Sequence, residues 1–191
     1  MKRLISLQKI GELDNKILIN LRKALDWYLN KYNLHFIIDQ KSIKLTRNEY
    51  DFLKQKYDAS LILQNLFLKN SQANMFCSLG VMDKDIFKNY NNFVFGVGIH
   101  FEYNIFKFPN LALISITRLK ESFYNRPSNE IITIKRSLKE AIHELGHAFG
   151  LKHCKNDCVM KFSKEIIEAD KKPLKFCIKC TKQLNDLFIS N

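Results

Sequence analysis

The amino-acid sequence predicts a single α/β domain in which helices cover a mostly parallel β-sheet. Segments with strand character alternate with segments of helical periodicity along the chain. Several of the strand segments are continuous apolar runs, which is typical of strands buried on both faces. At 191 residues the chain is long enough for one domain with its own core and short for two.

The first half of the chain contains three expected strands and two expected helices. Helices are expected where apolar residues recur at helical spacing, and strands where short β-type runs occur. The strands are expected at Lys2–Gln8, Leu34–Asp39 and Asn74–Val81, the helices at Asn15–Tyr32 and Ala59–Lys69. Between them, Arg47–Tyr57 is charged and indicates neither structure.

The second half adds two strands and one long helix. The strands are expected at Asn92–Phe101 and Asn110–Thr117, followed by a polar loop at Lys120–Ser128. Ser128 is the expected N-cap of the helix, because a serine hydroxyl can accept from a free amide of the first turn. An apolar stripe then continues to Gly150. We expect this helix to bury one face against the sheet and to direct its histidines the other way.

The end of the long helix carries the motif H-E-x-x-H-x-x-G-x-x-H. His143 and His147 lie four residues apart, so both can face one metal ion from the same side of a helix. Glu144 lies about 100° around the helix and can reach a metal-bound water. Gly150 permits a turn that returns the chain, so that His153 becomes a third ligand. Three histidines leave one zinc position open, as in a catalytic site.

The shorter motif H-E-x-x-H alone would also fit two surface histidines on an amphipathic helix. That alternative leaves Gly150 and His153 unexplained, whereas the longer motif is the metzincin pattern. The sequence therefore predicts a zinc metallopeptidase in which Glu144 acts as the general base for attack of water on a peptide bond.

Four of the five cysteines gather in the last fifth of the chain. Cys154 and Cys158 form one pair, and Cys177 and Cys180 form a second. This spacing favours a structural zinc site that fixes residues 163–191. Free thiols and a redox C-x-x-C pair are the alternatives. The remaining cysteine, Cys77, lies in an apolar stretch and is expected to be a buried, inert thiol.

The net charge of +12 raises the question of a nucleic acid or anionic lipid partner. The lysines are spread along the chain, and no nucleic-acid-binding module is recognisable, so a solvated basic surface is favoured. The sequence shows no apolar run long enough to span a membrane and no signal-peptide pattern, and we expect a cytoplasmic protein with a peptide or protein substrate.

The chain resembles the archaemetzincins, a family of metzincin-clan zinc peptidases. The resemblance covers His143–Cys180 and consists of H-E-x-x-H-x-x-G-x-x-H-C, then C-x-M, then C-x-x-C. Weaker similarity lies upstream, in Leu79–Val81 with Asp83 and Asp85, and in Asn92–Gly96. The resemblance implies a metzincin-like fold with a twisted five-stranded sheet. An N-terminal lobe would end near residue 150, and a small C-terminal lobe would cover about 151–191.

The resemblance also implies roles for the site residues. His143, His147 and His153 would bind a catalytic zinc, and Met160 would form the Met-turn beneath it. A second zinc would be held by the four clustered cysteines, Cys154, Cys158, Cys177 and Cys180. The strand Phe93–Phe101 would run antiparallel at the edge of the sheet and line the cleft.

Four interpretations stay open from the sequence alone. Met160 also fits a plain core position. Asp83 and Asp85 fit a cation site, although a capped turn is favoured. Tyr124, before the long helix, is a candidate for stabilising an oxyanion. The alternative function is a zinc-stabilised protein that binds peptides or nucleic acid in a peptidase-like cleft with little hydrolysis.

Overall fold

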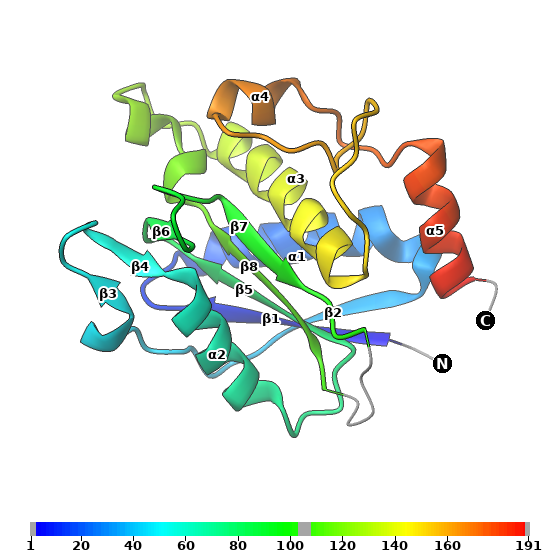
Figure 1. The fold of residues 1–191 in the computed structure, drawn as a ribbon, viewed down its shortest axis with the longest axis horizontal. Helices are drawn as coiled ribbons and strands as arrows, with labels where there is room; N and C mark the ends of the chain where they lie inside the picture. The colour runs from blue at the N-terminus through cyan, green and yellow to red at the C-terminus, as the bar shows by residue number, and fades with distance from the viewer. Residues whose placement is uncertain (1–2, 103–107, 190–191) are drawn as a thin grey trace.

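A five-stranded sheet forms the centre of the computed structural model, which describes residues 3–102 and 108–189 (Figure 1). In spatial order its strands are β2 (Leu34–Ile38), β1 (Arg3–Ile10), β5 (Cys77–Met82), β8 (Asn110–Ser115) and β7 (Gly96–Ile99). The first four are parallel, and β7 pairs antiparallel with β8 at the edge. This confirms the predicted mostly parallel sheet of five strands with an antiparallel edge. Lys2, expected to begin the first strand, lies outside the described residues.

Helices cover both faces of this sheet and explain its apolar strands. Helices α1 (Asn15–Leu29) and α3 (Glu130–Ala148) lie on one face, and α2 (Ala59–Asn70) lies on the other. Along β8, Ala112 joins the core under α1 and α3, whereas Leu113 joins the core under α2. Successive side chains of a strand alternate between faces, so a strand covered on both sides is apolar throughout.

Two predicted strands begin later in the structure than in the sequence pattern. The strand predicted at Asn74–Val81 begins at Cys77 and ends at Met82. The predicted strand Asn92–Phe101 is reduced to Gly96–Ile99, because its first part leaves the sheet and the Val94 N–H donates to the Ile86 carbonyl instead.

Capping side chains set the helix starts, and one differs from the expectation. Asp14 and Asp58 accept amide hydrogen bonds at the starts of α1 and α2. The predicted N-cap Ser128 is wrong, because Asn129 has the extended backbone of an N-cap and its Oδ1 accepts from the Ile132 N–H at 3.0 Å. Asparagine is as good an N-cap as serine, so residue type alone could not decide whether the helix begins after Ser128 or after Asn129.

The segment Arg47–Tyr57, ambiguous in sequence, belongs to a second, small sheet. It contains a 3-10 turn, η2 (Arg47–Glu49), and the strand β3 (Tyr50–Asp51), and it continues into β4 (Lys56–Asp58). The order of this sheet is β3-β4-β6, with β6 at Ile86–Phe87. Strands of two or three residues are too short to show a periodic pattern, so sequence analysis missed them.

The chain beyond the long helix contains two helices that sequence analysis did not predict, α4 (Ile166–Lys171) and α5 (Ile178–Phe188). The Phe188 ring lies 5.5 Å from the ring of Tyr32 in the 3-10 turn η1 (Asn30–Tyr32) and 5.1 Å from that of Phe149. The tail therefore shares the apolar core of the sheet. The division into two lobes near residue 150 stays a prediction.

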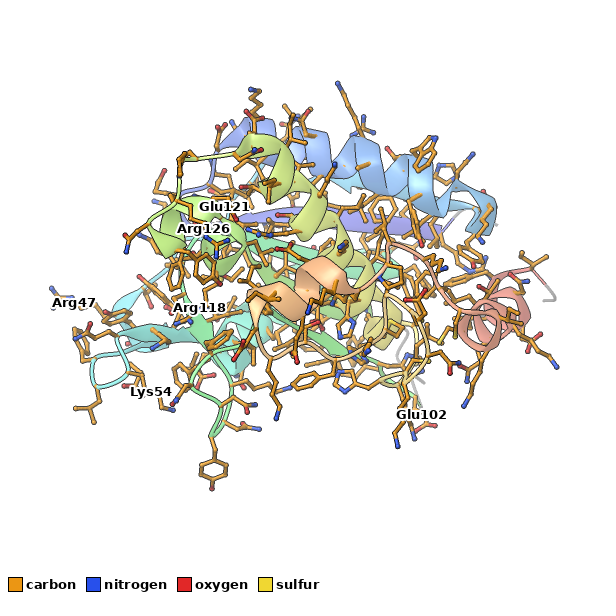
Figure 2. All side chains as sticks on the ribbon, turned by 90° about the horizontal axis from the view of Figure 1, so that it is seen from above. Arg47, Lys54, Glu102, Arg118, Glu121 and Arg126 are labelled. Carbon is orange, nitrogen blue, oxygen red and sulfur yellow. The ribbon has the colours of Figure 1, made fainter. Side chains whose placement is uncertain are left out.

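Ion pairs organise the segment between β8 and α3, which contains η3 (Thr117–Leu119) and η4 (Glu121–Tyr124). Figure 2 labels Arg118, Glu121 and Arg126 of this segment. The Arg118 guanidinium donates two bonds of 2.7 Å to Asp85, and Lys120 pairs with Asp83. Both aspartates are thus paired with cationic side chains, which disfavours a cation site there. Their hydrogen-bond partners in the described part of the chain are side chains and not turn amides, so the capped turn is not observed. Within the described residues, no helix combines the length and the apolar character needed to cross a membrane.

Candidate active site

Helix α3 ends in a Schellman motif that reverses the chain after the two motif histidines. The Leu151 N–H donates to the Gly146 carbonyl at 2.9 Å, and the Gly150 N–H donates to the His147 carbonyl at 2.9 Å. Gly150 has φ of +92°, which only glycine adopts readily. The return directs His153 toward the helix, and the structure brings His143, His147 and His153 together, with ligand atoms within 4.8 Å of one another.

Backbone carbonyls fix the orientation of two of these imidazoles. His143 Nδ1 donates to the Val159 carbonyl at 2.9 Å, and His147 Nδ1 donates to the Leu151 carbonyl at 2.8 Å. Because a carbonyl can only accept, each Nδ1 carries the proton and each Nε2 has a free lone pair. The two Nε2 atoms are 3.1 Å apart. Two lone pairs at that distance repel unless they share a cation.

The three-histidine site fits a zinc ion by spacing and by protonation. Tetrahedral zinc at about 2.05 Å from each nitrogen places its ligand nitrogens roughly 3.3 Å apart. Burial lowers the pKa of His143 well below its usual value, with the charge of Lys172 as a second cause. Burial also lowers the pKa values of His147 and His153. Neutral imidazole is the form that binds a metal, so the site favours ligation.

Glu144 lies beside the histidines in a cavity of about 460 Å³. Its side chain is buried, and burial raises its pKa well above the usual range, with Glu140 as a further cause. A dication held by the neighbouring histidines would oppose this shift, because an opposite charge favours the ionised carboxylate. The cavity is also lined by the rings of Phe93, Phe95 and Phe162. The arrangement places a carboxylate of raised pKa beside three histidines that fit a zinc ion, in a partly apolar cavity.

Met160 lies under the metal-binding face of α3. It is fully buried, and its sulfur occupies the space that a Cβ on Gly146 would take. Gly146 lies between the two motif histidines, so a larger residue there would collide with the methionine. In the motif H-E-x-x-H this glycine stands at an unspecified position. The close approach of the Met160 sulfur explains why the position has no side chain.

Two glycines of the edge strand allow α3 to approach the sheet. A Cβ on Gly96 would lie 2.5 Å from Glu144 Cγ, and one on Gly98 would lie 2.5 Å from His147 Cβ. The expectation that the helix buries only the face opposite its histidines is therefore wrong. Its last turns are enclosed by β7 as well, and both Glu144 and His143 are buried.

Replacing Gly98 with alanine is expected to displace the last turns of α3. The new Cβ would overlap the Glu144 carbonyl oxygen and His147 Cβ, neither of which can move alone. We expect a loss of about 1–3 kcal/mol in unfolding free energy, with a fall in kcat/KM for peptide hydrolysis. Denaturant unfolding and steady-state kinetics measure the two effects.

Leu113→Ala is the matched control for this prediction. Leu113 of β8 is buried in the core under α2 and is not among the residues that line the cavity. Its truncation should lower stability while kcat/KM stays close to that of the original protein. Similar kcat/KM in Gly98→Ala would contradict the positioning role of the glycine.

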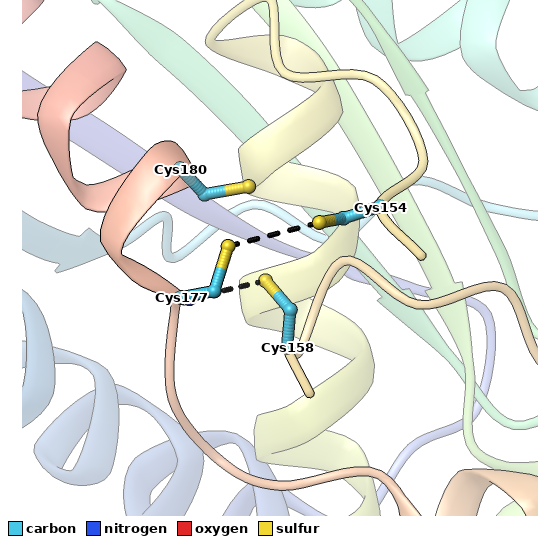
Figure 3. Close-up of side chains that lie close together, drawn as sticks. All are labelled: Cys154, Cys158, Cys177 and Cys180. Carbon is cyan, nitrogen blue, oxygen red and sulfur yellow. Dashed lines mark hydrogen bonds between the residues drawn. The ribbon is translucent and has the colours of Figure 1, made fainter. Parts of the chain in front are cut away.

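The four clustered cysteines form a second compact site (Figure 3). Their sulfurs lie within 4.8 Å of one another, and all four are free thiols. Cys154 Sγ and Cys177 Sγ are 3.7 Å apart, too far for a disulfide bond of ~2.05 Å. Tetrahedral zinc at about 2.3 Å from each sulfur would give roughly this separation. The donor set therefore fits a closed zinc site.

Hydrogen bonds support negative charge on two of the four sulfurs. Asn156 Nδ2 donates to Cys177 Sγ at 3.5 Å, and this is the main cause that lowers the pKa of Cys177 to about 6. Two backbone amides, of Met160 and Cys177, point at Cys158 Sγ from 3.5 and 3.3 Å. Burial nonetheless raises the pKa of Cys158, so a bound cation would be needed to hold that thiolate.

One short segment connects the two sites. Cys158 contributes a sulfur to the cysteine cluster, and the carbonyl of Val159 accepts from His143 Nδ1. Met160 follows directly, and its carbonyl accepts from the Cys154 N–H at 3.0 Å. The orientation of His143 thus depends on the segment that carries Cys158.

Tyr124 and Cys77, two further residues considered in the sequence, differ in outcome. The Tyr124 hydroxyl donates to the Arg118 carbonyl at 2.9 Å, and Tyr124 is not among the residues that line the cavity. The structure does not support the proposed oxyanion role for it. Cys77 is fully buried in β5, and burial raises the pKa of its thiol, as expected for an inert cysteine.

The cavity also contains an ion pair that sequence analysis missed. Glu140 and Lys172 lie 32 positions apart, and their side chains meet at 2.8 Å. The sequence places Glu140 one helical turn before Glu144, but nothing in it indicates that Lys172 is its partner.

Comparison with known proteins gives consistent results. The sequence model of peptidase family M54 matches residues 14–186. The chain is 35% identical over 188 residues to the archaemetzincin of Pyrococcus abyssi, covering 96% of this chain and 95% of that one. It is similar to a zinc-dependent peptidase structure from Methanocorpusculum labreanum, with a TM-score of 0.79 and 26% identity over 95% of this chain and 100% of that one. It is also similar to the malonate complex of the Archaeoglobus fulgidus archaemetzincin, with a TM-score of 0.75 and 28% identity over 94% and 99% of the two chains.

Proposed function

Because the chain belongs to peptidase family M54 and is a zinc metallopeptidase, we propose that His143, His147 and His153 hold its catalytic zinc in a metzincin-type site. The observation that carries this proposal is the convergence of three neutral imidazoles beside Glu144. Two of them are oriented by backbone carbonyls, so their free nitrogens point at one place.

Each site residue has a distinct part in the proposed hydrolysis. Zinc in the three-histidine site supplies Lewis-acid chemistry, by acidifying water and polarising the peptide carbonyl. Glu144 accepts the proton of the attacking water and delivers it to the leaving amine. Met160 supports α3 from below through its contact at Gly146.

We further propose that Cys154, Cys158, Cys177 and Cys180 hold a second, structural zinc. The sulfur spacing and the amide donors around Cys158 support this ligand set. All five cysteines are free, which is typical of a reducing compartment and supports a cytoplasmic location. A peptide or protein is the substrate that a peptidase requires. The alternative of a binding protein with little hydrolysis is not favoured, since it gives no use to a buried base beside an open metal site.

Elemental analysis of the purified protein is the experiment that tests both sites. We expect two zinc ions per chain, and one in a His143→Ala/His147→Ala variant, which retains the cysteine site. Blocked peptides should be cleaved only by the protein with both ions, with activity lost on chelation and restored by zinc. A double variant that still binds two zinc ions would refute the assignment of the histidines.

A variant of His100 is the control for that experiment. His100 is an exposed histidine whose Nδ1 lies 3.1 Å from the Ala148 carbonyl, near the end of α3 but outside the three-histidine site. His100→Ala should retain two zinc ions. If His100→Ala also loses one zinc, the zinc loss in the double variant could be due to disturbance of the end of α3 and would not identify the ligands.

A further inference from the structure

The cavity beside the histidines contains a buried ion pair that has no part in the hydrolysis proposed above. Glu140 lies one helical turn before Glu144 on α3, and Lys172 directly follows α4. Lys172 Nζ donates to Glu140 Oε1 at 2.8 Å, and the two side chains are only 1% and 4% exposed. Both residues line the same cavity as Glu144 and His143.

Lys172 has unused hydrogen-bonding capacity at this position. A lysine ammonium carries three N–H donors. Among the described residues only Glu140 accepts from Lys172 Nζ. A buried donor left without a partner is costly, so the remaining N–H groups require an acceptor inside the cavity. Ser163 contributes a second such group to the cavity, because its Oγ is buried and has no partner within the described part of the chain.

Holding α4 against α3 does not require this ion pair. Arg136 on α3 already forms two hydrogen bonds of 2.7 and 2.6 Å with the Asp170 carboxylate. Lys139 adds a bond of 2.7 Å to the Asp170 carbonyl. A purely structural pair would also be replaceable by apolar side chains at little cost. Lys172 lines the cavity while it is shielded from bulk solvent, which indicates a role toward what the cavity binds.

The charge around Lys172 favours an anion. Lys88 and Lys164 also line the cavity, and no ion pair within the described residues involves either of them. Lys172 also lines the same cavity as His143 and Glu144. Its positive charge therefore lies beside the place where the scissile peptide bond would lie.

We propose that Lys172, held in place by Glu140, binds a carboxylate of the substrate close to the scissile bond. The carboxylate would belong either to an acidic side chain or to the C-terminus of the peptide. Lys172 would then be a specificity-determining residue, and Ser163 Oγ would be a second donor for the same group. This inference rests on the proposed peptidase function and adds a substrate class to it.

Matched peptides test the proposal on the unaltered, zinc-loaded protein. Short blocked peptides would carry Glu or Gln, which have the same shape, at each position flanking the scissile bond, with free or amidated C-termini. We expect kcat/KM to be about tenfold higher for at least one carboxylate-bearing peptide than for its neutral counterpart. A difference of this size matches a buried hydrogen bond between charged groups. A preference in amidated peptides identifies a side chain, and one that depends on the free terminus identifies the C-terminal carboxylate.

Lys172→Met is the diagnostic variant, and Lys171→Met is its matched control. Lys171 precedes it in the chain, but its side chain is exposed. The carboxylate preference should disappear in Lys172→Met and persist in Lys171→Met. Because Lys172→Met leaves Glu140 buried without its partner, Glu140→Gln/Lys172→Met provides a second route if the single variant does not fold. Equal kcat/KM for Glu and Gln peptides in the unaltered protein would overturn the proposal, as would a preference that survives in these variants.

Failure of the proposed function gives a different result from failure of this inference. If no peptide in the series is cleaved, the peptidase assignment to these residues fails, and affinities of the same peptides are then measured by fluorescence anisotropy. Tighter binding of the acidic peptide that is lost in Lys172→Met would still support a carboxylate site. Equal affinities for acidic and neutral peptides would exclude it.

Discussion

A Glu144→Gln variant should retain both zinc ions and lose peptide hydrolysis by about 10²–10⁴-fold in kcat, the usual contribution of general acid–base catalysis. Glutamine keeps the shape of the side chain but cannot accept and return a proton. Glu144 is buried beside the three histidines and lines the same cavity, so its carboxylate is placed to take a proton from water in that cavity. Steady-state kinetics with a cleaved blocked peptide, together with zinc content, measure the effect.

The control for this prediction is Glu130→Gln in the first turn of the same helix. Glu130 is exposed, pairs with Lys16 at 2.8 Å, and is not among the residues that line the cavity. Its replacement should leave kcat unchanged, since an exposed ion pair contributes little. Full activity in Glu144→Gln would remove this carboxylate from the mechanism. Loss of zinc in that variant would show that it supports the metal site instead.

The sequence predicted the main sheet and the two metal-site patterns because each is encoded locally. Residues of the motif from His143 to His153 occupy fixed positions on one helix and its Schellman turn, so spacing alone places them. The strands β5 and β8 are buried throughout and mostly apolar because helices cover both faces. Such features depend on neighbours in the chain or on average burial.

What the sequence did not predict depends on contacts between distant segments. At Gly98 a side chain would collide with α3, and at Gly146 a side chain would collide with the Met160 sulfur. The partner of Glu140 is 32 positions away, and its position is known only once α4 is folded. The same holds for the Val159 carbonyl, whose role as the acceptor for His143 has no sequence signature.

Removal of one cysteine ligand is expected to affect both metal sites. In Cys158→Ala the closed thiolate site loses a ligand, and its zinc should no longer be retained. Structural zinc contributes on the order of 10–16 kcal/mol in zinc-finger peptides, against a total stability of ~5–15 kcal/mol for a typical domain. We therefore expect a large fall in thermal stability. Cys77→Ala is the control, because Cys77 is buried but lies outside the cluster.

The same variant tests whether the catalytic site depends on the cysteine site. The Cys158 sulfur accepts a hydrogen bond from the Met160 N–H, and the carbonyl of the intervening residue, Val159, orients His143. Release of this segment should free the His143 imidazole and weaken the binding of zinc by the histidines about 10–100-fold, the usual effect of losing a partner that orients a metal ligand. Zinc titration of folded Cys158→Ala at low temperature measures this affinity. An unchanged affinity would show that α3 alone orients the histidines, and that the cysteine cluster stabilises the tail without supporting the active site.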